Sequence, residues 1–223
     1  MIRKVVLVSA LSLVLGANIV HNAQAGNQVQ CFRAFLNDTM TLLEQGNVSI
    51  NKKRQTIIDR YLPIINFEFN AKMAMGLPYK ALSPQDQKEY VNEYTKLLAY
   101  TWLPKLNYDR KNGIVVTVMD KTQPVNDKDE IVKARMQTPD GKSYDMDLRI
   151  RDLSKTDRKI KCQILNIVVE GVDLAATYRA QFSDQIEKNG GDGRVITKFL
   201  KEQNAKSKKE TGLVVNIQWS LEI

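Results

Sequence analysis

Residues 160–182 constrain the fold of this chain most, because a strand pattern there changes abruptly into a helix pattern. The first part, up to Val169, is a short run of branched apolar residues, which is typical of a strand covered on both faces. Glu170 and Gly171 interrupt the run, and Asp173 is a favourable residue to cap the start of a helix. Apolar residues then recur at helical spacing, at Leu174, Tyr178, Phe182 and Ile186. We therefore expect a buried strand that turns sharply into an amphipathic helix, which folds back over the sheet.

The first 25 residues have the pattern of a cleaved secretory signal. Arg3 and Lys4 precede an apolar stretch at residues 5–20, and Ala23-Gln24-Ala25 fits the small-x-small cleavage rule. The stretch is too short, and ends too clearly in a cleavage site, to favour a permanent membrane span; an uncleaved anchor is the alternative. We therefore expect residues 1–25 to be a signal peptide and the rest of the chain to be exported.

The composition of such an exported chain excludes several kinds of chemistry. The single histidine, His21, lies in the expected signal, and without it Ser-His-Asp catalysis, Cys-His catalysis and His-containing zinc sites are excluded. Cys31 and Cys162 could pair after export, but the sequence cannot place their Cα atoms, so a disulfide and two buried thiols both stay open. Loss of Arg3 and Lys4 lowers the net charge from +8 to +6, which gives little support to nucleic-acid binding.

Helix patterns lie on both sides of a block of strand patterns. Helical spacing and helix breakers predict helices at about 32–46, 50–62, 66–76 and 83–102, and two more after residue 173. Alternation predicts strands at 114–120, 130–138, 143–151 and 160–169, with Pro139-Asp140-Gly141 as a hairpin turn. Such segregated blocks predict an α+β fold: a four-stranded antiparallel sheet with helices packed on one face, enclosing an apolar cavity. Residues 26–206 would form this single domain.

No catalytic, metal-binding or phosphate-binding motif is present. Asp145 and Asp147 alternate with inward apolar residues, so they belong to the solvent face of a strand rather than to a catalytic pair. Arg149 and Arg151 continue that face, and a solvated basic surface is the default interpretation. The functional alternative is docking of this face to an acidic partner or an anionic headgroup. An enzyme would need paired acidic residues inside the pocket, and the alternation places no such pair inward.

Three segments together resemble one known family. They are Tyr61-Leu62-Pro63-Ile64-Ile65-Asn66-Phe67 continuing to Met75-Gly76, then Ser83-Pro84-Gln85-Asp86, then Val169-Glu170-Gly171-Val172-Asp173 with Tyr178-Arg179-Ala180-Gln181-Phe182. Their order and spacing resemble the MlaC family, also called the toluene-tolerance auxiliary family, over roughly residues 57–206. The chain departs from the family pattern at Cys162, Asn166 and Asp173, where an aromatic residue, Asp and Ser are common.

The resemblance implies a soluble, monomeric periplasmic phospholipid carrier that is not an enzyme and uses no cofactor. The implied partners are phospholipid, an outer-membrane lipoprotein complex and an inner-membrane transporter complex with an MCE-domain protein. The acyl chains would lie in the apolar cavity, and the inward apolar stripes supply candidates for its lining. The expected lipid-binding residues are Phe67, Phe69, Met73, Leu97, Trp102, Leu103, Val116, Met136, Leu148, Val169, Tyr178 and Phe182.

A lipid carrier is physically reasonable but has a rival. Each buried methylene contributes about 0.8 kcal/mol, so an acyl chain resists leaving a membrane by roughly 10 kcal/mol, which an apolar cavity must offset. The rival is an exported interaction module with a solid core and no lipid ligand. Its working surfaces would be the basic sheet face and the tail at 207–223, where apolar residues alternate from Leu213 to Ile223. That pattern fits an added strand or an unattached tail, and the sequence does not choose between them.

Overall fold

The computed structural model describes residues 26–105, 114–138 and 140–215 of the chain. The expected signal peptide, the end of the tail and Pro139 of the expected turn lie outside the described residues. The elements follow one another as α1 (Asn27–Glu44), α2 (Ile50–Tyr61), η1 (Leu62–Ile64), α3 (Phe67–Met75), η2 (Leu77–Ala81), α4 (Pro84–Trp102), η3 (Leu103–Lys105), β1 (Val115–Pro124), β2 (Asp129–Gln137), β3 (Ser143–Asp152), β4 (Cys162–Val169), β5 (Val172–Asp173), α5 (Leu174–Lys188) and α6 (Arg194–Thr211).

The fold is α+β, with an antiparallel sheet of five strands in the order β1-β2-β3-β4-β5. The expectation of four strands is wrong because β5 turns back and pairs with the end of β4. Glu170 and Gly171 both have positive φ angles, 50° and 75°. Two consecutive residues with positive φ close a tight hairpin. Glutamate seldom adopts this conformation, so the residue types did not predict a fifth strand.

The helix after this hairpin begins as expected. The Asp173 carboxylate accepts a hydrogen bond from the backbone N–H of Ala176 at 3.0 Å, which caps α5. The same carboxylate accepts a bond from the Asn166 amide at 2.7 Å, and this bond fixes the cap to β4. Beyond its first turns, α5 packs against α3 and α6.

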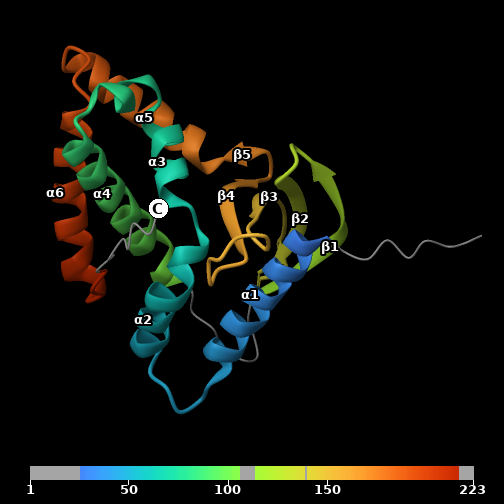
Figure 1. The fold of residues 1–223 in the computed structure, drawn as a ribbon. Helices are drawn as coiled ribbons and strands as arrows, with labels where there is room; N and C mark the ends of the chain where they lie inside the picture. Colours follow the sequence, from blue (N-terminus) through green and yellow to red (C-terminus); the bar gives the residue numbers. More distant parts are fainter. Residues whose placement is uncertain (1–25, 106–113, 139, 216–223) are drawn as a thin grey trace, which may run out of the picture.

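Helix α1 covers one face of the sheet, which we call the inner face (Figure 1). Val29 and Phe32 of α1 are buried against Val132, Leu148 and Ile150. A disulfide between Cys31 of α1 and Cys162 of β4 holds the helix on the sheet, with the two Cα atoms 6.2 Å apart. The sequence left open whether Cys31 and Cys162 form a disulfide or stay as two buried thiols, and the structure has the disulfide.

Helices α3 to α6 form a helical layer with its own core, beside the sheet rather than over its inner face (Figure 1). This layer meets the sheet at the edge of β4, where Ile65 forms a parallel bridge with Ile164. The Asn66 backbone N–H donates to the Ile164 carbonyl at 2.8 Å, and the Asn70 side chain donates to the Leu165 carbonyl at 2.7 Å. These bonds satisfy an edge that would otherwise present unpaired backbone groups. We expected the helices to cover one face of the sheet. Helix α1 does so, whereas helices α3 to α6 attach mainly at the β4 edge.

A third cluster closes the far end of the helical layer. Helix α6 continues to Thr211, past the expected start of the tail at residue 207. Leu213 and Val215 follow it and are buried at 3% exposure each, against Ile58 and other residues of α1, α2 and α4. The first part of the tail is therefore core, and the part that would form an added strand lies outside the described residues. Among the residues that the structure describes, no helix combines the length and the apolarity that crossing a bilayer requires.

Candidate functional site

The inner face of the sheet changes from fully buried to partly buried along its strands, and Val116 and Met146 still pack against the buried cluster under α1. Under α1, Val132, Leu148 and Ile150 are at most 1% exposed. Towards the other end of the same face, the apolar residues are only partly buried. These are Val116, Met136, Tyr144, Met146 and Val169, and we call them the open end of the inner face.

Strand register makes the open end one continuous surface. Val116 lies opposite Met136, which lies opposite Tyr144 on the next strand. Met146 lies opposite Val169 in the same way. Directly paired residues share a face of the sheet, so all five side chains point to the side that α1 occupies elsewhere. The surface has no charged group and includes two methionines, whose flexible side chains adapt to irregular apolar partners. Its chemistry suits contact with an apolar chain.

The four expected lipid-binding residues on the sheet share this face. Val116, Met136 and Val169 belong to the open end, whereas Leu148 is 1% exposed beneath α1. Any ligand that reached Leu148 would have to displace α1 from the sheet. Tyr144 and Met146 of the open end were not among the expected residues, although alternation already placed them inward. The sequence could not show which end of each strand α1 covers.

Three expected residues lie in the helical layer. Phe182 is 1% exposed and meets the Tyr90 and Tyr94 rings edge-on, with centroids 6.4 and 6.3 Å away. Tyr178 and Leu97 are partly buried against the same cluster. Burial raises the pKa of Tyr90 and of Tyr94 far above the ordinary value, so both hydroxyls stay protonated. This aromatic cluster fills the middle of the helical layer with the protein's own side chains.

The three expected residues of α3 differ in their surroundings. Phe67 is 2% exposed, whereas Met73 is 38% exposed. The Phe69 ring lies under the Arg149 guanidinium, 5.7 Å from centroid to Cζ. Arg149 stands on the outer face of the sheet, so Phe69 contacts the face opposite to the open end.

The last two expected residues lie where α4 ends. Trp102 is 43% exposed, and Leu103 is 4% exposed in the cluster with Leu213 and Val215. The twelve expected residues are therefore spread over several packing groups. The enclosed apolar cavity expected between sheet and helices is not shown by the described residues, and the assignment of these twelve to lipid contact stays a prediction.

The outer face of the sheet is not a bare basic surface. The carboxylate of Asp129 is fully buried and accepts hydrogen bonds from Arg149 at 2.6 Å and from Arg151 at 2.7 Å. The bonds from Arg151, and then those from Arg149, hold the pKa of this carboxyl well below its ordinary value, although burial opposes them. Two further cations of the face also have carboxylate partners, since Lys133 pairs with Asp147 at 3.1 Å and Arg135 with Asp145 at 2.7 Å. The face thus alternates in charge, which weakens the case for docking to an anionic surface there.

Within the part of the chain that the structure describes, no three acidic, cysteine or histidine residues are grouped so that they could hold a metal ion. The apolar side chains of the open end likewise have no atoms that coordinate a metal ion well.

The sequence profile of the MlaC protein matches residues 33–201, which is most of the chain. The chain therefore belongs to the MlaC family, as its three motifs indicated. A comparison with curated proteins finds no match.

Among solved structures, the chain is similar to a phospholipid-binding protein from Ralstonia solanacearum, determined in complex with a phospholipid at 1.53 Å. The two are 22% identical, with a TM-score of 0.63, over 82% of this chain and 99% of the other. This TM-score establishes a shared fold, and an identity this low establishes nothing beyond the fold.

Proposed function

We propose that this protein is a periplasmic phospholipid carrier that holds acyl chains against the open end of its inner face. The observation that carries the proposal is the partly buried apolar surface of Val116, Met136, Tyr144, Met146 and Val169, which continues the fully buried part of the same sheet face. Membership of the MlaC family and the phospholipid complex of the structural neighbour support it.

The open end has the physical properties that acyl-chain binding needs. Apolar contact area offsets the roughly 10 kcal/mol by which an acyl chain resists leaving a membrane. Met136 and Met146 can change rotamer to make room for a chain, at a smaller cost than moving β-branched or aromatic residues. The carrier would work without a catalytic step. It would take up lipid at one membrane complex and release it at another, with the MCE-domain transporter and the outer-membrane lipoprotein complex as its partners.

The rival function, an exported interaction module without lipid, has one observation in its favour. The helical layer is filled by Tyr90, Tyr94 and Phe182, and Leu148 is sealed beneath α1. A solid core of this kind needs no ligand for its stability. Lipid content of the purified protein separates the two functions.

The test compares two methionines of the same sheet. Met136 belongs to the open end, whereas Met119 of β1 is 36% exposed and lies outside it. We expect Met136→Lys to lower the phospholipid that is extracted per mole of exported protein by at least about tenfold, because a charge on an acyl-binding surface must be desolvated. Met119→Lys should retain the wild-type amount. Equal lipid content in the two folded variants would overturn the placement of acyl chains at the open end.

A further inference from the structure

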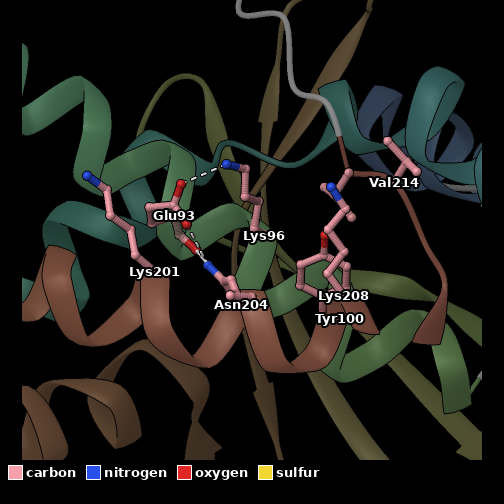
Figure 2. Close-up of a pocket in the computed structure, with 9 residues that line it drawn as sticks. Glu93, Lys96, Tyr100, Lys201, Asn204, Lys208 and Val214 are labelled. Atoms are coloured by element: carbon pink, nitrogen blue, oxygen red, sulfur yellow. Dashed lines mark hydrogen bonds and ion pairs between the residues drawn. The ribbon is translucent and has the colours of Figure 1, made fainter. Parts of the chain in front are cut away.

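A pocket of about 350 Å³ lies between α4 and α6, where the chain leaves α6 (Figure 2). It shares no residue with the open end of the inner face. Polar and charged side chains dominate its lining. The lining residues are Glu93, Lys96, Tyr100, Lys201, Asn204, Ala205, Lys208, Val214 and Val215.

The charge of the pocket is positive. Three lysines line it, and the ammonium groups of Lys96 and Lys208 lie on one side of Glu93, with that of Lys201 on the other (Figure 2). Lys96 pairs with Glu93 at 2.7 Å, and Lys201 pairs with Glu89 at 2.6 Å. Among the described residues, Lys208 has no carboxylate within ion-pair distance. Each ammonium has three donors, so Lys96 keeps donors for a further acceptor after its bond to Glu93.

The second feature is a buried acceptor without a donor. Asn204 is 5% exposed, and its amide nitrogen donates to the Glu93 carbonyl at 2.9 Å and to the Glu93 carboxylate at 2.8 Å. Both partners are acceptors, so a flipped amide would set oxygen against oxygen, and the orientation of the group is fixed. The Asn204 Oδ1 atom is then left buried with no hydrogen-bond partner among the described residues. A buried acceptor without a hydrogen-bond donor destabilises the folded protein, and a ligand that supplies a donor removes this cost.

A ligand that matches this pocket needs an anionic group to pair with the lysines and a hydrogen-bond donor for Asn204. We propose that the α4–α6 pocket binds a phosphate ester that carries a neighbouring hydroxyl group. The phosphate oxygens would accept from Lys208 and Lys96. Because Asn204 Oδ1 is buried, the side chains that cover it would have to shift before the hydroxyl could donate to it. A free sugar or glycerol phosphate and the phosphoglycerol part of a lipid headgroup share this chemistry. A metal cation is disfavoured by the three lysines, and an acyl chain by the polar lining.

Isothermal titration calorimetry of the exported protein at low ionic strength tests the proposal with sn-glycerol 3-phosphate as the probe. We expect saturable binding that Lys208→Gln weakens by roughly tenfold, as loss of a charge-assisted hydrogen bond requires. Lys209→Gln removes the neighbouring exposed lysine, which does not line the pocket, and should leave the affinity unchanged. Absence of saturable binding, or equal affinities for the two variants, would overturn the proposal.

The choice of ligands tests the role of Asn204 and separates the two sources. Methyl phosphate offers the anion without the hydroxyl, so it should bind more weakly than glycerol 3-phosphate; equal binding would overturn the assignment to Asn204 Oδ1. Tighter binding of glycerophosphoglycerol, a soluble phosphodiester headgroup, would assign the pocket to a lipid headgroup, and weaker binding would assign it to a free phosphate monoester. The carrier proposal is tested by the lipid content of Met136→Lys, a residue that does not line this pocket, so failure here and failure of the carrier proposal are distinguishable.

Discussion

The Phe69 ring lies 5.7 Å from the Arg149 guanidinium, and this contact joins α3 of the helical layer to the outer face of the sheet. A cation over an aromatic face contributes about 0.5–2 kcal/mol, depending on how far it is desolvated. The same arginine is also held by the buried Asp129 carboxylate, which fixes the guanidinium in place.

Phe69→Leu should therefore destabilise the protein by about 1–2 kcal/mol, because leucine keeps apolar contact but loses the interaction with Arg149. Urea unfolding at neutral pH measures the change in free energy. Extracted phospholipid should stay at the wild-type level, since Phe69 faces away from the open end. A stable variant that has lost its lipid would instead place Phe69 in the lipid-binding surface.

The buried Asp129 carboxylate should make the free energy of unfolding depend on pH. Its pKa is depressed in the folded protein, so its contribution is fully present above the unfolded pKa of about 4 and is lost as the pH falls towards the folded value. Asp129→Asn leaves Arg149 and Arg151 without their carboxylate and should cost on the order of 3 kcal/mol at pH 7. The difference in unfolding free energy between wild type and variant should shrink as the pH falls below about 4. A difference that is constant from pH 7 to pH 2 would contradict the role of this carboxylate.

The disulfide between Cys31 and Cys162 closes a loop of 131 residues and attaches α1 to the sheet. Replacing both cysteines with alanine should lower the free energy of unfolding by about 2–5 kcal/mol, because the unfolded chain gains conformational freedom. Reductant should destabilise the wild-type protein by a similar amount and leave the double variant unchanged. Thermal unfolding with and without reductant supplies the measurement, and a wild-type protein insensitive to full reduction would contradict this account.

The buried residues after α6 make the start of the tail part of the core. Leu213→Ala should destabilise the protein by about 2–4 kcal/mol, since it opens a cavity beside Ile58 and Leu103. Val214→Ala is the matched control, because Val214 is 46% exposed and should change stability by less than about 0.5 kcal/mol. Similar urea midpoints for the two variants would show that this segment does not contribute to the core.

The local features of the fold could be predicted from the sequence, whereas the long-range contacts could not. The β4 strand and the cap of α5 by Asp173 followed from apolar runs and capping chemistry within a few residues. The fifth strand depended on Glu170 adopting a left-handed conformation, which no simple preference predicts. The docking of Ile65 on Ile164 joins residues 99 positions apart, so periodicity carries no information about it.

The candidate site shows the same division. Alternation placed Met136 on the inner face, and the register shows that Val116 and Val169 share this face with it. Val169 ends a continuous apolar run, in which alternation does not separate the two faces. Alternation could not show that α1 buries Leu148 and leaves the open end of the inner face only partly buried. The α4–α6 pocket could not be predicted from the sequence, because Lys96 and Lys208 line the same pocket only when the two helices pack together.

Native mass spectrometry of the protein purified from a lipid-containing host tests the central claim most directly. The account predicts a population whose mass exceeds that of the polypeptide by one phospholipid, and a loss of that population in Met136→Lys but not in Met119→Lys. A wild-type spectrum that shows only the mass of the bare polypeptide would contradict the carrier function.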